Sequence, residues 1–280
     1  MNKTSKWEYV VHYVILNSIA IFALFPFYWM FVTSVKPAEQ ILQIPPAWWP
    51  SYFEFKNYTE VFQIMPLFEY LKNSIIYSLS TTIVCVLLAC FAGYSLSRFR
   101  FKIRNASIVL ILSSQLIPWV MSIIPFYFIM QSLKLNNTTI GITLAYSIWA
   151  IPFCTLMLKN YFTSTLPVEI EESAMIDGCS RMKILFVIAL PISIPGIVAT
   201  AIFSFILAWN EYMWASIVLS DTKYKPLSVG IHDFIGQFGV TPSVSLFMAA
   251  SVITTLPILL IFGFLQKYLI SGMSDGAIKG

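Results

Sequence analysis

The sequence predicts an all-α integral membrane protein with six transmembrane helices, and three observations support this prediction. Of the 280 residues, 58% are apolar and only 11% carry a charged side chain, and the mean hydropathy is +0.77. The apolar residues are gathered into long runs rather than dispersed along the chain. Each run provides about the 20 helical residues needed to cross the hydrocarbon core of a bilayer.

Six runs are candidate spans, and Glu211 is the one charged residue within them. A β-barrel would show shorter segments in which apolar and polar residues alternate, whereas these runs are continuously apolar, so helices explain them better. In chain order the candidate spans are residues 10–35, 73–97, 106–133, 140–158, 184–220 and 244–266.

The basic residues between the runs predict the orientation in the membrane. Eleven Lys and Arg residues lie on the side of the N-terminus and six on the opposite side, so the positive-inside rule makes both termini cytoplasmic. The first run is too long for the apolar part of a signal peptide and should remain as a span. Residues 1–9 form the predicted cytoplasmic N-terminus, 10–270 the membrane domain and 271–280 a cytoplasmic tail. The net charge of +4 needs no nucleic-acid partner, because the basic cluster at 98–104 follows the same rule.

The loop at 159–183, between the fourth and fifth runs, is the segment richest in information. Pro167 suits the first turn of a helix, and the glutamates after it meet the positive end of the helix dipole. Asp177-Gly178 should interrupt this helix, because glycine accepts a turn that other residues resist. Two short cytoplasmic helices around a glycine elbow are therefore predicted. Their apolar stripe would consist of Val168, Met175, Cys179 and Met182.

Two partners could receive this amphipathic loop. A helix that rests on lipid headgroups normally presents Lys and Arg, and periodicity alone leaves that alternative open. The acidic first turn favours a protein partner instead.

A family resemblance rests on the run Glu172-Ser173-Ala174-Met175-Ile176-Asp177-Gly178-Cys179, followed by Leu190-Pro191 and Pro195. This pattern resembles the EAA loop of ABC importer permeases, with small residues, Ser173 and Cys179, where alanine is usual. The resemblance implies the type I importer (MetI-like) permease fold, in which this loop is a coupling helix seated in a groove of a separate ATPase subunit. It assigns that contact to Glu172, Ser173, Ala174, Asp177 and Gly178.

No phosphate-binding G-x-x-x-x-G-K-[ST] motif occurs in the sequence, so ATP and Mg²⁺ are expected on the ATPase subunit. We expect this chain itself to be no enzyme, with no catalytic residue, cofactor or metal.

The fifth run is too long for one straight span. As a continuous helix, residues 184–220 would extend about 55 Å at 1.5 Å per residue. Pro191, Pro195 and Gly196 near its inner end predict a bend, and a static kink explains them more simply than a moving hinge.

Glu211 lies about 15 Å inside the outer end of the fifth run if the helix is straight. A carboxylate there costs about 2.5 kcal/mol or more unless it faces water or a partner. Trp209 and Asn210 add an aromatic face and an amide, which proteins use to stack on and hydrogen-bond sugar rings. Trp209-Asn210-Glu211 is therefore a predicted substrate pathway. Alternatively, Tyr212 and Trp214 mark the outer interface and Glu211 merely touches water.

The Trp-Asn pair followed by an acidic residue, and the C-terminal sequence 272–280, resemble the MalG-like carbohydrate branch of these permeases. In that branch the tail reaches between the ATPase subunits, which makes Gly276, Lys279 and Gly280 candidate contacts. The resemblance implies import of sugars, with di- and oligosaccharides leading and glycerol phosphate or acidic sugars as alternatives. It also implies the cytoplasmic (inner) membrane, a second homologous permease as heterodimer partner, two copies of the ATPase and an extracytoplasmic sugar-binding protein.

Two other classes of function were weighed. A self-sufficient secondary transporter should show inverted repeats and several ionisable residues within its spans, and the sequence shows neither. A membrane enzyme should show a catalytic constellation, but His12 and His232 stand apart from any carboxylate cluster.

Overall fold

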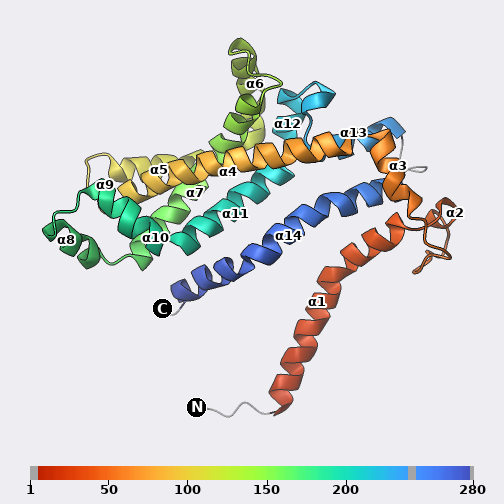
Figure 1. Cartoon of the computed structure of the whole chain (residues 1–280), viewed down its shortest axis with the longest axis horizontal. Helices are drawn as coiled ribbons and strands as arrows, with labels where there is room; N and C mark the ends of the chain where they lie inside the picture. The colour runs from red at the N-terminus through yellow and green to blue at the C-terminus, as the bar shows by residue number, and fades with distance from the viewer. Residues whose placement is uncertain (1–5, 239–243, 278–280) are drawn as a thin grey trace. The chain divides into compact units, whose positions relative to one another are not determined.

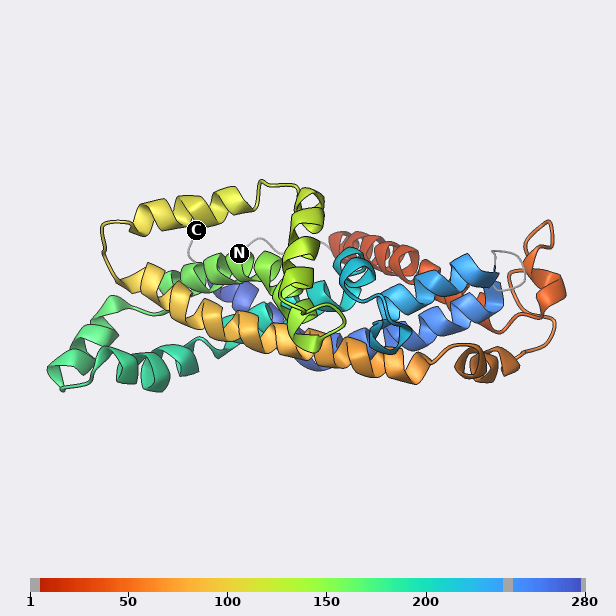
Figure 2. The ribbon, with the colours of Figure 1, turned by 90° about the horizontal axis from the view of Figure 1, so that it is seen from above.

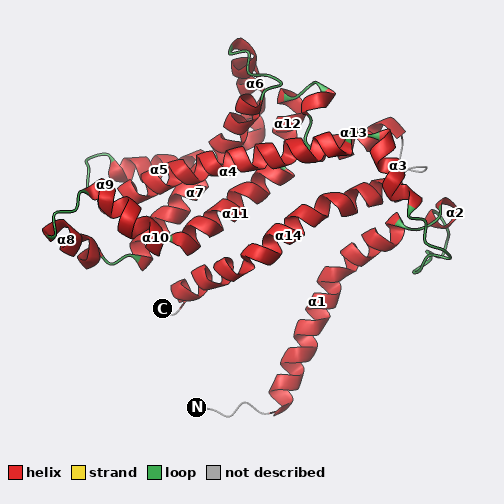
Figure 3. Ribbon diagram, viewed as in Figure 1, coloured by secondary structure: helices red, strands yellow, loops and turns green. Residues whose placement is uncertain are grey.

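The structure, a computed structural model, describes residues 6–238 and 244–277, and every regular element in these two ranges is helical (Figure 3). The chain divides into two compact units, residues 1–67 with 231–256 and residues 68–230 with 257–280. Each unit is described by itself.

The first unit contains α1 (Lys6–Ser34), α2 (Ala38–Ile41) and α3 (Lys56–Ile64). The end of α1 is joined to α3 by two hydrogen bonds. Asn57 donates from Nδ2 to the Ser34 carbonyl at 2.9 Å, and the hydroxyls of Ser34 and Tyr58 lie 2.7 Å apart. The apolar side chains along most of α1 are exposed on this chain, as in Phe22 with 83% exposure. This pattern is typical of a helix that faces lipid or another subunit.

The second unit contains the long helices α4 (Leu67–Arg98, which begins one residue before the unit), α7 (Thr139–Thr165) and α11 (Ile194–Asn210). Close packing between them depends on small residues. A Cβ at Gly93 of α4 would lie 2.9 Å from the backbone nitrogen of Lys159 in α7, and one at Gly196 of α11 would lie 2.5 Å from the Tyr161 ring. The shorter elements are α5 (Arg104–Ser114), a 3-10 turn (Trp119–Ser122), α6 (Ile123–Ser132), α8 (Val168–Ile176), α9 (Arg181–Ile184), a π-helical turn (Leu185–Ala189), α10 (Leu190–Ile192), α12 (Met213–Val218), a second 3-10 turn (Thr222–Tyr224) and the start of α13 (Leu227–Phe238).

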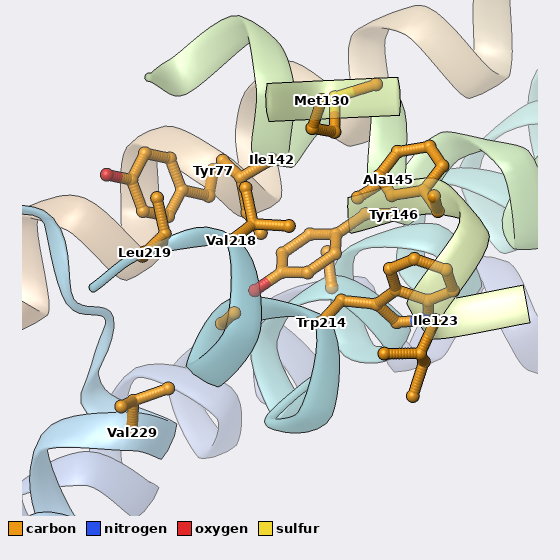
Figure 4. Close-up of a cluster of buried hydrophobic side chains, with 13 residues drawn as sticks. Tyr77, Ile123, Met130, Ile142, Ala145, Tyr146, Trp214, Val218, Leu219 and Val229 are labelled. Atoms are coloured by element: carbon orange, nitrogen blue, oxygen red, sulfur yellow. The ribbon is translucent and has the colours of Figure 1, made fainter. Parts of the chain in front are cut away.

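Two hydrophobic clusters form the core of this unit. One joins α4 to α7 and the π-helical turn at the end where α8 and α9 lie. The other gathers side chains of α4, α6, α7 and α12, with Tyr77, Tyr146 and Trp214 as its largest members (Figure 4). The second cluster therefore holds the short α12 against the long helices.

Among the described residues, four helices are long and apolar enough to cross a membrane, and the total reaches six if each of two bent pairs is one span. The four lie in the predicted first, second, fourth and sixth runs, and the last of them belongs to α14 (Val244–Ala277). The third run is not one continuous helix. Its halves α5 and α6 meet at 93° (Figures 1 and 2), because Pro118 adopts an extended conformation and disfavours helix in the residue before it.

The fifth run is also broken. The predicted bend is confirmed, since Arg181–Ile192 and Ile194–Asn210 meet at 78° beside Pro191, Pro195 and Gly196. The assumption of a helix that continues past Glu211 is wrong. α11 ends at Asn210, Glu211 is extended, and α12 begins at Met213.

The predicted tail does not begin as a separate segment. α14 continues to Ala277, so Gly276 lies in this helix. Lys279 and Gly280 lie outside the described residues.

Candidate functional site

The predicted pair of short helices around a glycine elbow is confirmed, as α8 and α9. Pro167 precedes α8 in an extended conformation, and Gly178 has a φ of +82°, the left-handed region that glycine adopts without strain. The hydroxyl of Ser180 then caps α9 by accepting the backbone N–H of Lys183 at 3.3 Å. In Figure 1 this loop lies at one end of the second unit.

Burial in the loop does not follow its apolar pattern. Glu171 is only 1% exposed, and Ala174 is buried beside it. The apolar side chains of Val168, Ile176 and Met182 are instead exposed, up to 86% for Ile176. The predicted stripe is therefore divided, since Val168 and Met182 are exposed whereas Met175 and Cys179 are half-buried. Together with Ile176, its exposed members form an apolar outward surface of the loop.

Glu171 is held by a buried ion pair that the sequence did not predict. The sequence analysis selected its neighbour Glu172, which is exposed. Arg98, at the end of α4, donates from Nε to Oε1 of Glu171 at 2.7 Å, and the two side chains are 5% and 1% exposed. Tyr94 donates to the other carboxylate oxygen at 3.2 Å, and Arg181 lies 3.7 Å from it.

Arg98 connects a third element. Its Nη2 donates to the carbonyl of Phe162 at 2.9 Å and also to the carbonyl of Leu166, which follows α7. Both carbonyls lie at the end of α7, where backbone partners become scarce, although the Phe162 carbonyl also accepts the backbone N–H of Leu166 at 3.4 Å. One guanidinium therefore joins α4, the end of α7 and the loop that carries α8.

Glu211 has a local structural role at the second predicted site. Its Oε1 accepts the backbone N–H of Met213 at 3.1 Å, and its Oε2 accepts those of Trp214 at 3.0 Å and Ala215 at 3.3 Å. The carboxylate therefore caps the start of α12. This explains how an apolar segment accommodates it, because backbone N–H groups freed by the helix break satisfy its oxygens.

The three residues of the predicted substrate pathway do not share one environment. Trp209 is 5% exposed and stacks on Phe205, with ring centroids 5.6 Å apart. Asn210 and Glu211 instead line a cavity of about 380 Å³, together with Trp119, Tyr146, Trp149, Leu207, Tyr212, Met213 and Trp214. The structure thus brings two of the three to a cavity whose aromatic walls come from distant parts of the chain.

The bent spans and the exposed two-helix loop are typical of one class of protein, a membrane permease of the ABC importer fold. The chain superposes with a TM-score of 0.82 on a subunit of a bacterial ABC transporter involved in the import of the acidic polysaccharide alginate, over 96% of this chain and 99% of that one at 22% identity. Residues 85–275 match the model of the binding-protein-dependent transport system inner membrane components. The chain belongs to this family.

Named relatives are similar in sequence to this chain over nearly its whole length. The chain is 34% identical to the diacetylchitobiose uptake system permease DasC of Streptomyces coelicolor, over 92% of each chain. It is 37% identical to the trehalose/maltose permease MalG of Thermococcus litoralis, over 94% of each. It is 32% identical to the sulfoquinovosyl glycerol permease SmoH of Agrobacterium fabrum, over 96% of this chain and 94% of that one. These findings confirm the family resemblance of the EAA-like loop.

Proposed function

We propose that this chain is the permease subunit of an ABC importer for sugars, in which a separate ATPase subunit drives alternating access to the transport pathway. The observation that carries the proposal is the identity of 34% and 37%, over more than nine tenths of the chain, to permeases named for diacetylchitobiose and for trehalose and maltose. Their substrates are glycosides, which favours a di- or oligosaccharide over glycerol phosphate.

The coupling loop would be the contact with the ATPase. Its outward surface is rich in exposed apolar side chains, and patches of this kind on a folded chain mark interaction sites. Glu172, Ser173, Asp177 and Gly178 are exposed beside this surface, whereas Ala174 is buried under it. Closure of the ATPase would displace α8, and the bonds of Arg98 would carry this displacement to α4 and α7.

The assembly would contain a second homologous permease, two ATPase copies that bind ATP and Mg²⁺, and an extracytoplasmic sugar-binding protein. In support, a solved relative of this fold, with a TM-score of 0.68, is a bacterial alginate ABC transporter in complex with an alginate pentasaccharide-bound periplasmic protein. Both termini would be cytoplasmic in an inner membrane. Gly276, Lys279 and Gly280 would approach the ATPase from the tail.

The test is reconstitution of the assembled complex in proteoliposomes with its binding protein. Maltose, trehalose and diacetylchitobiose are supplied outside, and both uptake and ATP hydrolysis are measured. We expect at least one sugar to stimulate ATP hydrolysis and to accumulate only when ATP is enclosed. Uptake driven by an ion gradient without ATP would identify a secondary transporter and refute the proposal.

A further inference from the structure

The cavity beside Glu211 contains two buried polar atoms without a hydrogen-bond partner among the described residues. They are Oη of Tyr146, a residue that is 1% exposed, and Nε1 of Trp149. Both residues line the cavity and come from α7. Because buried polar groups in folded proteins are almost always paired, these two atoms require a partner that the described chain does not supply, and the cavity leaves room for a ligand or water to supply it.

The cavity walls suit the rings of a sugar. Trp119 and Trp149 contribute indole groups, and Asn210 contributes an amide whose Nδ2 already donates to the Ile206 carbonyl at 2.9 Å. The Oδ1 atom of this amide is a further acceptor. A volume of about 380 Å³ falls within the range of small-molecule sites, about 300–1,000 Å³. Aromatic faces with a few polar groups offer both stacking and hydrogen bonds to a hydroxylated ring.

The charge of the walls selects among sugars. Of the nine described residues that line the cavity, Glu211 is the charged one and no Lys or Arg is present. An anionic ligand would therefore meet a carboxylate at close range, with little solvent to screen the repulsion and no cation to offset it. An uncharged ring meets no such repulsion, and its hydroxyls can both accept from Trp149 and pair with Tyr146.

We propose that this cavity binds one ring of an uncharged sugar, with Trp149 Nε1 and Tyr146 Oη as hydrogen-bond partners and Glu211 excluding sugar acids and phosphates. The proposal rests on the proposed function and narrows its substrate class. The relatives are named for both neutral and anionic substrates, since trehalose and maltose are neutral whereas sulfoquinovosyl glycerol is a sulfonate.

The experiment uses the assembled transporter in nanodiscs and equilibrium dialysis of radiolabelled probes. Neutral probes are maltose, trehalose, diacetylchitobiose and cellobiose, and anionic probes are cellobiouronate, which adds a carboxylate to cellobiose, and sn-glycerol 3-phosphate. Tyr146→Phe removes one polar atom and keeps the ring, and Trp149→Phe removes Nε1 while keeping a smaller aromatic ring. Trp49→Phe changes an exposed tryptophan that does not line the cavity and serves as the matched control.

We expect a neutral disaccharide to bind more tightly than either anionic probe. Trp149→Phe and Tyr146→Phe should each weaken its binding about fivefold, the effect of one neutral hydrogen bond, whereas Trp49→Phe should bind like wild type. The cavity proposal is overturned if no neutral disaccharide binds, if anionic probes bind as tightly, or if all three variants bind alike. ATP-driven uptake of a sugar together with one of these results would leave the proposed function intact, whereas absence of ATP-driven sugar uptake would refute that function.

Discussion

Replacing Arg98 with methionine should weaken the attachment of the coupling loop to the membrane helices. The substitution keeps the length of the side chain but leaves the carboxylate of Glu171, which is 1% exposed, with only the half-exposed Arg181 at 3.7 Å as a nearby cation among the described residues. Breaking a buried ion pair from one side costs about 3–5 kcal/mol. The lower part of this range applies here, because Arg181 and Tyr94 still contact the carboxylate, although the Leu166 carbonyl loses its side-chain donor at the same time.

The double variant Arg98→Met/Glu171→Leu separates the energy of the ion pair from the effects of the two single substitutions. It removes both charges, so no buried carboxylate remains, although the carbonyls of Phe162 and Leu166 still lack the guanidinium. Loss of the hydrogen bonds from Arg98 to these carbonyls costs about 1–3 kcal/mol of stability. Replacement of the ion pair itself by apolar side chains changes the stability little. Glu171→Leu alone leaves the buried Arg98 guanidinium without its carboxylate and should also cost about 3 kcal/mol. The double variant, at about 2 kcal/mol, should therefore fall about 4 kcal/mol short of the sum of the two single losses, and this difference is the interaction energy.

The assay is a double-mutant cycle on the purified chain in mixed micelles, unfolded by SDS and followed by helix circular dichroism. The exposed pair Lys56–Glu60 in α3, with 71% and 31% side-chain exposure, provides the control cycle and should give about 0.3–0.5 kcal/mol. An interaction energy below about 0.5 kcal/mol at Arg98 and Glu171 lies within simple additivity and would refute the coupling of loop and helices through this pair.

Three further predictions concern single sites. Gly178→Val should destabilise the elbow by about 1–2 kcal/mol through its φ of +82° alone, since a Cβ there meets no atom within 4 Å; Gly178→Asn should be milder in the same unfolding assay. Gly196→Ala should lower the thermal unfolding midpoint because its Cβ would lie 2.5 Å from the Tyr161 ring, whereas Gly263→Ala, with open space at the Cβ, should not. Ile176→Asp should leave the fold intact, because the side chain is 86% exposed, but should reduce co-purification of the ATPase; unchanged co-purification would exclude this surface as the contact.

The membrane helices were predictable because the bilayer acts on each segment locally. A run of about 20 apolar residues identifies a span without knowledge of the rest of the fold. The Gly178 elbow was predictable for a similar reason, since its conformation depends on one residue. The division of the third run at Pro118 shows the limit of this approach, because run length alone ignored a residue that breaks helices.

The buried ion pair was not predictable from the loop. Glu171 and Glu172 are neighbours of identical chemistry, and only one of them points toward Arg98, which lies 73 positions earlier. The cavity presents the same difficulty, since Trp119, Trp149 and Asn210 meet there from three separate helical segments. The local sequence correctly selected Asn210 and Glu211 as polar residues near the cavity. The aromatic residue that it selected with them, Trp209, packs on Phe205 instead.

The helix break at Glu211 connects the fold to the proposed site. A carboxylate within a straight apolar helix would have no donors, because every backbone N–H is used by the helix itself. Ending α11 at Asn210 frees the N–H groups of α12, and the carboxylate accepts three of them. Both carboxylate oxygens are therefore engaged in holding the break. A sugar in the cavity must then be recognised mainly by neutral groups, with Glu211 acting through the sign of its charge.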